Sequence, residues 1–217
     1  MTTGRRMLAI AHRSGNTVTG LREALDAGVD LVEADLHAYR GRLEVRHHKS
    51  LGPAHLWDRW EIISRTDLVR VGLIDLLEEL GDDPRLMLDL KGVLPGLPRT
   101  VSKVLDTRGP DVPITICSKH WWMLDMFGPG VLPVLSVSNR ISLARLRRRL
   151  AAAPAYGVSV ALDLVTPQLV AQLKTGAEVV MTWPVDTPKA LVQAQRAGVD
   201  GVISKNLDLL VQIASGP

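Results

Sequence analysis

Three acidic side chains stand in otherwise apolar runs of this sequence. Glu33 and Asp35 lie two residues apart in "LVEADL", and Asp89 stands two residues before Lys91 in "LMLDLK". If both runs are strands, the members of each pair point to the same side, because side chains alternate along a strand. Three converging carboxylates repel one another unless a cation lies between them, and an all-oxygen ligand set suits Mg²⁺ or Ca²⁺ rather than zinc. The sequence therefore predicts a site for a hard divalent cation.

Histidines near these acids could supply proton transfer. His12 ends the apolar run "MLAIAH", and the adjacent pair His47 and His48 follows soon after the first two acids. A divalent cation typically binds an anionic oxygen of a phosphate, while a nearby imidazole takes or gives a proton. We expect His12 and His47 in that role, with Arg13 and Lys91 as further positive charges for the anion. His48 by itself is more typical of a solvated side chain.

Trp183 ends another apolar run, "EVVMTW". It could be a large core residue, because burying an aromatic ring is favourable by itself, or a substrate contact at the end of a strand. Both interpretations stay open, and we include Trp183 among the candidate substrate-binding residues.

Short apolar runs alternate with longer segments of helical period along the whole chain. The eight runs cover residues 7–12, 30–36, 85–91, 113–118, 131–137, 157–164, 178–183 and 201–205. Several intervening segments open with Thr or Ser and close with Gly, as helix caps do. This alternation is typical of parallel strands joined by crossover helices, and it predicts an α/β fold, a (β/α)8 TIM barrel. Active sites of such barrels lie at the C-terminal ends of the strands, where the polar residues above occur.

One long segment, residues 49–71, departs from this rhythm and contains Trp57 and Trp60. It follows the second predicted strand, so in a barrel it would lie over the catalytic end. We expect a short irregular segment there that shapes the substrate site.

Length and composition favour one globular domain over residues 1–217. Hydrophobic residues make up 46% of the chain and charged residues 23%, which suggests neither a disordered chain nor a membrane protein. No apolar run is long enough to span a bilayer, and the N-terminal apolar stretch ends too soon for a signal peptide. We therefore expect a cytoplasmic protein without stable membrane insertion. The single cysteine, Cys117, excludes an intramolecular disulfide and a cysteine-rich zinc site.

The formal net charge of +3 points mildly toward anionic ligands. The densest basic run, "RLRRRL", lies in a helical pattern whose exposed face would be solvated anyway, and no glycine-aromatic motif for base stacking occurs. We expect a small-molecule phosphodiester as the ligand rather than a nucleic acid. The sequence does not indicate an oligomeric state.

Five segments of the chain resemble the glycerophosphodiester phosphodiesterase family. In the family's order they are "IAHRSGNT", "AGVDLVEADLHAYRGRLEVRHH", "LMLDLKG", "MTWPVD" and "AGVDGVISKNLDLL", and they span nearly the whole sequence. The second segment is quite specific, whereas the last would be weak alone. The resemblance implies a barrel that binds a divalent cation, Mg²⁺ or Ca²⁺, and hydrolyses a glycerophosphodiester to glycerol 3-phosphate and an alcohol.

The resemblance also implies roles for individual residues. The metal ligands would be Glu33, Asp35 and Asp89. The general acid and base would be His12 and His47. The basic residues that accompany them would be Arg13 and Lys91. One histidine would deprotonate the attacking water or hydroxyl, and the other would protonate the departing alcohol.

The chain departs from the family pattern at several positions. Ser14 replaces the usual glycine, His48 the usual aspartate, Asp89 a glutamate, and Lys205 an aspartate near the last strand. These departures leave open a protein without turnover that binds a phosphodiester or phosphate. A second alternative keeps the same site but uses a hydroxyl of the substrate itself as the nucleophile, which releases a cyclic phosphate. A phosphate-binding isomerase barrel is disfavoured, because the loops after the last two strands lack a glycine-rich cradle.

Overall fold

The computed structural model describes residues 6–58, 60–68, 71–108 and 112–216. Within these residues, eight parallel strands close into a barrel, because β1 pairs with both β13 and β2. The barrel strands are β1 (Leu8–Ala11), β2 (Leu31–Tyr39), β8 (Leu86–Leu90), β9 (Ile114–Ser118), β10 (Val131–Val137), β11 (Ala155–Ala161), β12 (Ala177–Trp183) and β13 (Gly201–Ser204). The predicted TIM barrel is confirmed, and each predicted strand overlaps an observed one.

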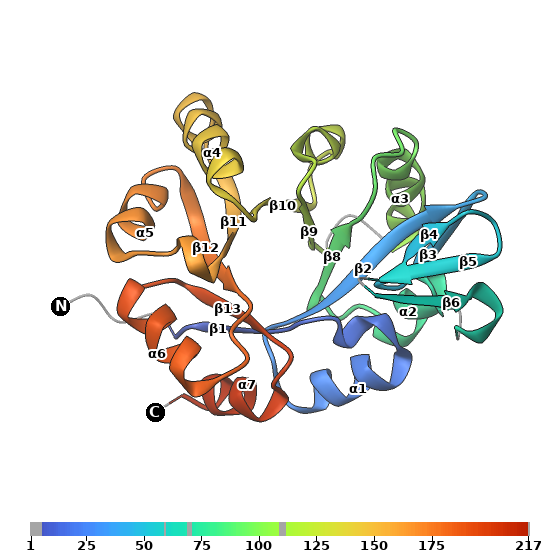
Figure 1. Ribbon diagram of the computed structural model, residues 1–217, viewed down its shortest axis with the longest axis horizontal. Helices are drawn as coiled ribbons and strands as arrows, with labels where there is room; N and C mark the ends of the chain where they lie inside the picture. The colour runs from blue at the N-terminus through green and yellow to red at the C-terminus, as the bar shows by residue number, and fades with distance from the viewer. Residues whose placement is uncertain (1–5, 59, 69–70, 109–111, 217) are drawn as a thin grey trace.

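Helices surround this ring of strands (Figure 1). They are α1 (Val18–Asp26), α2 (Leu73–Leu80), α3 (Leu97–Leu105), α4 (Arg140–Ala152), α5 (Pro167–Leu173), α6 (Pro188–Ala197) and α7 (Leu207–Ala214). Side-chain oxygens cap several of them: Thr17, Thr166 and Thr187 each accept a hydrogen bond from a backbone N–H of the first turn. After β9 the connection is a 3-10 helix, η4 (Trp121–Met126), instead of an α-helix. The short 3-10 helix η1 (Ser14–Asn16) connects β1 to α1.

Apolar side chains fill the inside of the barrel. This inner layer consists of Ile10, Met87, Cys117, Val134, Val179, Met181 and Ile203. Burial of each large apolar side chain contributes roughly 1.5–3 kcal/mol. Along β8, Met87 belongs to this layer, and Asp89 lies two residues further toward the C-terminal end of the strand. Asp89 therefore lies at the C-terminal mouth of the barrel, above this apolar layer.

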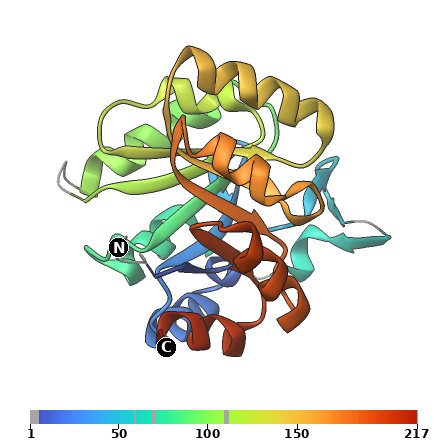
Figure 2. The same cartoon turned by 90° about the vertical axis from the view of Figure 1, so that its left-hand side faces the viewer.

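Residues 49–71, which the sequence predicted to be irregular, include an insertion beside this mouth, described over residues 49–58, 60–68 and 71. Three short strands form an antiparallel sheet there: β4 (Lys49–Leu51), β5 (His55–Asp58) and β6 (Glu61–Ser64). Two more, β3 (Arg42–Val45) and β7 (Val71–Gly72), extend the barrel sheet from β2. Strands of two to four residues are too short to give a recognisable alternation in sequence. In Figure 2 this insertion projects to the right of the barrel.

A buried ion cluster ties the insertion together. Glu44 on β3 accepts hydrogen bonds from Arg46 Nε at 2.8 Å and from Arg65 Nη1 at 2.6 Å. Arg46 and Arg65 are 4% and 7% exposed, and the Arg65 guanidinium lies 3.5 Å from the centre of the Tyr39 ring on β2. Because Arg46 directly precedes His47, this cluster fixes the backbone that carries that histidine.

Glu44→Ala is expected to destabilise the protein by about 3–5 kcal/mol, because it leaves two buried guanidinium groups without their acid. Burial acts to raise the pKa of Glu44, but the two arginines outweigh it and hold this pKa below its ordinary value of 4.5. The contribution of Glu44 is therefore present above that value and is lost as the pH falls through the lower folded pKa. Urea unfolding followed by circular dichroism measures the loss. The exposed Glu78→Ala on α2 is the matched control, and equal stability of the two variants would contradict the role of the cluster.

Candidate active site

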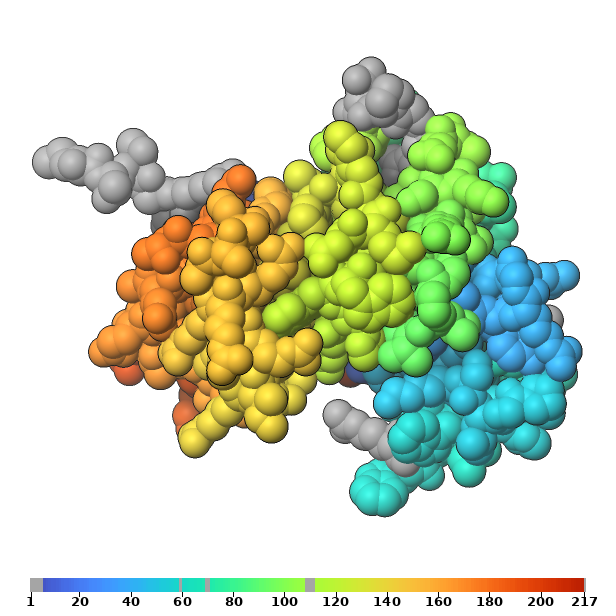
Figure 3. Space-filling view, turned by 90° about the horizontal axis from the view of Figure 1, so that it is seen from above, coloured from blue at the N-terminus to red at the C-terminus, as the bar shows by residue number. Residues whose placement is uncertain are grey.

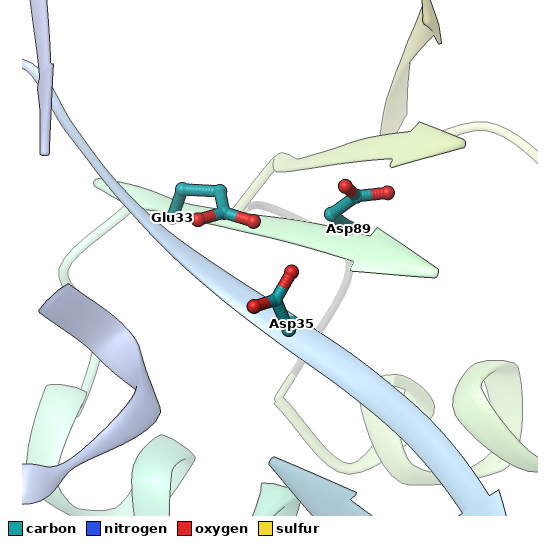
Figure 4. Close-up of side chains that lie close together, drawn as sticks. All are labelled: Glu33, Asp35 and Asp89. Atoms are coloured by element: carbon teal, nitrogen blue, oxygen red, sulfur yellow. The ribbon is translucent and has the colours of Figure 1, made fainter. Parts of the chain in front are cut away.

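Three carboxylates meet at the C-terminal mouth of the barrel. Glu33 and Asp35 lie on β2 and Asp89 lies on β8, and the register of these strands pairs Asp35 with Asp89. One oxygen of each acid lies within 4.8 Å of an oxygen of the others. Figure 4 shows the three side chains close together on the two neighbouring strands. The alternation of side chains along β2 and the parallel register with β8 produce this convergence.

Asp35 is fully buried and held from two sides. Asn16 Nδ2 donates to Asp35 Oδ2 at 3.0 Å, and the backbone N–H of Asp35 donates to Asn16 Oδ1 at 2.8 Å. His47 Nδ1 lies 3.0 Å from the same Oδ2, and Arg13 Nε lies 3.6 Å from it. Asp35 Oδ1 has no hydrogen bond within the described part of the chain. That oxygen instead faces the ammonium group of Lys91 at 2.7 Å, so a positive charge already lies beside it, as at a carboxylate that binds a cation.

Lys91 lies among the same acids. Lys91 Nζ lies 2.7 Å from Asp35 Oδ1, with which it forms an ion pair. The same ammonium group donates a hydrogen bond to Asp89 Oδ2. Burial acts to lower the pKa of Lys91, but the neighbouring carboxylates outweigh it and raise this pKa above 10.5. A divalent cation held by all three acids would require the ammonium group to turn from Asp35 into the cavity that Lys91 also lines.

Burial acts to raise the pKa of all three acids, and nearby groups outweigh it only at Asp35. Burial, and then the carboxylate of Asp35, raises the pKa of Glu33, and burial raises that of Asp89 despite the nearby Lys91. Burial would also raise the pKa of Asp35, but the hydrogen bond from His47 and the charge of Lys91 outweigh it and lower this pKa. Buried acids of this kind keep their charge at least cost beside a cation. The three residues therefore fit a hard divalent cation.

The two candidate histidines differ in their surroundings. Burial, and then the charge of Arg13, lowers the pKa of His12 to about 4, so this ring is neutral at neutral pH. His12 Nε2 lies 4.0 Å from Glu33 Oε2. His47 stands between two acids, with Nδ1 3.0 Å from Asp35 Oδ2 and Nε2 3.2 Å from Asp58 Oδ2. Both ring nitrogens of His47 therefore face carboxylate oxygens.

His48 points to a different neighbour from His47. Its Nε2 lies 3.7 Å from Glu61 Oε2 on β6, and the ring centres of the two histidines are 6.4 Å apart. His47, not His48, therefore contacts the buried acids.

The remaining candidates also lie around the mouth. Arg13 has φ of 63°, in the left-handed region, and its backbone N–H donates to Glu33 Oε2 at 2.6 Å. Trp183 ends β12, and Lys119 Nζ lies 5.3 Å from the centre of its ring. Arg13 thus contacts one of the acids, Glu33, through its backbone, and its side-chain Nε lies 3.6 Å from Asp35 Oδ2.

A cavity of about 140 Å³ connects these residues. Its lining comprises His12, Arg13, Glu33, His47, Met87, Asp89, Lys91, Cys117, Lys119, Ser136, Ser159, Trp183 and Ile203. Asp35 lies beneath it, fully buried. Every candidate site residue of the sequence except Asp35 therefore lines one cavity, at the end of the barrel where such sites occur.

Asn16 and Asp58, which contact Asp35 and His47, were absent from the sequence predictions. Asn16 stands in "SGNT", and its only signal is that it follows the first histidine by a few residues. Asp58 lies in the insertion, and its contact with His47 depends on β5 folding back over the mouth. Neither contact has a fixed sequence spacing that would predict it.

Asn16→Ala is expected to weaken divalent-cation binding by about 10–100-fold, because residues that orient metal ligands typically have effects of this size. The change removes both hydrogen bonds that fix Asp35. Isothermal titration calorimetry with Mg²⁺ or Ca²⁺ measures the affinity, with the exposed Gln195→Ala on α6 as the control. Equal affinities for both variants would show that Asn16 does not position the acid.

Comparisons with known proteins identify the fold. No family model and no curated protein matches the sequence. Among solved structures, a putative glycerophosphoryl diester phosphodiesterase from Silicibacter pomeroyi has a TM-score of 0.79 at 18% identity, over 98% of this chain and 94% of that one. The chain has the fold of glycerophosphodiester phosphodiesterases. At this identity, the likeness establishes the fold alone.

Two further structures of this fold agree along almost their full length. A glycerophosphodiester phosphodiesterase from Thermotoga maritima has a TM-score of 0.73 at 18% identity, over 96% of this chain and 99% of that one. A phosphodiesterase from Oleispira antarctica was solved with the product sn-glycerol-3-phosphate. It has a TM-score of 0.74 at 18% identity, over 97% of this chain and 98% of that one. Within the described residues, no helix combines the length and the apolar character that crossing a membrane requires.

Proposed function

We propose that this protein is a metal-dependent phosphodiesterase that hydrolyses glycerophosphodiesters to glycerol 3-phosphate and an alcohol. The observation that carries the proposal is the grouping of three acids and two histidines around one barrel mouth. The fold shared with glycerophosphodiester phosphodiesterases supports it. The glycerol 3-phosphate bound to the Oleispira antarctica phosphodiesterase supports glycerol phosphate as one half of the substrate.

The acids and the basic residues would divide the binding of the cation and the anion. Glu33, Asp35 and Asp89 would hold Mg²⁺ or Ca²⁺ through their carboxylate oxygens. A hard divalent cation supplies positive charge that polarises a phosphoryl oxygen. Lys91, turned away from Asp35, would bind a second phosphoryl oxygen, and so would Arg13, whose Nε has no hydrogen bond within the described residues.

The two histidines would divide the proton transfers. Neutral His12 would take the proton of the water that attacks phosphorus. His47, which lies between Asp35 and Asp58, would give a proton to the alcohol oxygen as its bond to phosphorus breaks. Each positioned transfer typically contributes about 10²–10⁴-fold to the rate.

One observation favours a second candidate, a phosphodiester-binding protein without turnover. Lys91 already contacts Asp35 and Asp89, which supplies positive charge where the cation would lie. If the Lys91 ammonium stayed beside Asp35 and Asp89, it would occupy the place of the cation. Arg13 and Lys91 could then bind the phosphodiester, but no cation would activate its phosphate.

Phosphorus NMR on glycerophosphoglycerol distinguishes these functions. We expect the diester signal to be replaced by that of glycerol 3-phosphate in the presence of Mg²⁺ or Ca²⁺, to persist in EDTA, and to persist with His12→Ala. A cyclic phosphate signal would instead indicate attack by a hydroxyl of the substrate. A diester that persists with both ions would favour the binding protein and overturn the proposal.

A further inference from the structure

A second cavity, of about 580 Å³, adjoins the one that contains the acids. The two cavities share His47, Asp89, Lys91 and Lys119. The second one extends between the insertion and the segments that follow β8 and β9, and its further lining includes Lys49, Ser50, Asp58, Gly92, Leu94 and His120. In Figure 3 the insertion (cyan) protrudes at the lower right of the molecule. A substrate bound at the acids could therefore extend into this space.

His37 gives this cavity a built polar group. It lies on β2, two residues beyond Asp35, so its side chain is on the same face of the strand as that acid. The residue is only 8% exposed and lines the cavity, and its Nε2 has no hydrogen-bond partner within the described residues. Because a buried polar atom without a partner is unfavourable, a ligand that hydrogen-bonds to this nitrogen would be favoured.

Two lysines of the cavity lack acidic partners. Neither Lys49 nor Lys119 forms an ion pair within the described part of the chain; their ammonium groups lie 4.9 Å from the centre of the Trp57 ring and 5.3 Å from that of Trp183. Both residues are exposed at the cavity. Their charges are therefore available to a ligand.

The acids of the cavity are already paired. Asp58 contacts His47 at 3.2 Å, and Asp89 contacts Lys91. The groups that remain for a ligand are thus the ammonium groups of Lys49 and Lys119 and Nε2 of His37. Together they favour a ligand with an anionic group and several acceptor oxygens.

We infer that this second cavity receives the alcohol half of the substrate and selects alcohols that carry a further anionic group, such as a second phosphate. The inference rests on the proposed function, because it assumes that the scissile phosphate lies beside the three acids. His47 stands where the two cavities meet, so the oxygen that leaves phosphorus would lie within its reach. Lys49 and Lys119 would then bind the second anion, and His37 would hydrogen-bond to the alcohol.

Three diesters that differ only in the alcohol test this selectivity. Each has a glycerophosphoryl half, and the alcohol is glycerol phosphate, glycerol or choline, so that it is anionic, neutral or cationic. We expect kcat/KM to be about tenfold higher for the anionic than for the neutral alcohol, and lowest for choline. A preference for choline or for the neutral alcohol would overturn the inference.

Single substitutions connect the selectivity to the cavity. Lys119→Met and Lys49→Met should each lower the ratio of kcat/KM for the anionic over the neutral alcohol, whereas the exposed Lys103→Met on α3 should leave this ratio unchanged. His37→Phe should reduce the affinity for all three alcohols. If the ratio is the same in both cavity variants and the control, the lysines do not bind the alcohol.

Failure of the inference can be separated from failure of the proposed function. If none of the three diesters is hydrolysed with Mg²⁺ or Ca²⁺, the proposed function fails. Calorimetric titration of the same diesters then still ranks the cavity's preference. Tighter binding of the anionic diester, reduced by Lys49→Met, would support the cavity, and equal binding of all three would overturn it.

Discussion

His47→Ala is expected to lower kcat for a glycerophosphodiester by about 10²–10⁴-fold, the usual contribution of a positioned general acid. The ring lies between Asp35 and Asp58 at hydrogen-bonding distance from both. Its removal takes away the group that would protonate the departing alcohol but leaves the three candidate metal ligands in place. Steady-state release of glycerol 3-phosphate measures the effect, and KM for the diester should change far less than kcat.

The neighbouring histidine provides the matched control for this prediction. His48 contacts Glu61 on β6 rather than the buried acids. His48→Ala should therefore keep kcat near that of the unsubstituted protein. If His48→Ala abolished turnover and His47→Ala did not, the assignment of the acid would be wrong.

Asp35→Asn is expected to abolish turnover together with divalent-cation binding. The change keeps the size of the side chain but removes the charge of the most buried acid of the site. It also removes one of the two carboxylates that pair with Lys91, whose Nζ lies 2.7 Å from Asp35 Oδ1. Because changes outside the ligand set already weaken metal binding by about 10–100-fold, loss of a ligand should weaken it at least that much.

Calorimetric titration with Mg²⁺ or Ca²⁺ measures cation binding, and release of glycerol 3-phosphate measures turnover. The exposed Asp26→Asn on α1 is the control, and circular dichroism establishes that each variant is folded. Cation binding that survives Asp35→Asn unchanged would mean that the cation is held elsewhere.

The barrel strands could be predicted because they are buried on both faces. Such strands read as continuous apolar runs, and each of the eight predicted runs overlaps a barrel strand. The connection after β9 differs, since its helical segment is a 3-10 helix of six residues. The strands of the insertion were not predicted, because they depend on pairing with one another rather than on a buried apolar face.

The convergence of the acids could be predicted from local geometry. Two-residue spacing places Glu33 and Asp35 on one face of β2, and the parallel register places Asp89 beside Asp35. The sequence also predicted that Asp89 and Lys91 share a face, but not that Lys91 contacts Asp35. That contact depends on the rotamer of a long side chain and on the charges around it, which no spacing encodes.

The contacts of the insertion with the site could not be predicted for a different reason. Asp58 reaches His47, and Lys49 lines the second cavity, only because the antiparallel sheet of β4, β5 and β6 lies beside the barrel mouth. Such contacts are set by how two structural units pack. They carry no periodic signal in either segment.

The most direct test of the central claim is an anomalous diffraction measurement on crystals soaked with Mn²⁺, which takes oxygen ligands as Mg²⁺ does. We predict a single strong peak bound by carboxylate oxygens of Glu33, Asp35 and Asp89, with the Lys91 ammonium turned away from Asp35. A site without a peak, in which Lys91 still contacts Asp35 and Asp89, would contradict the proposal that these acids hold a catalytic cation.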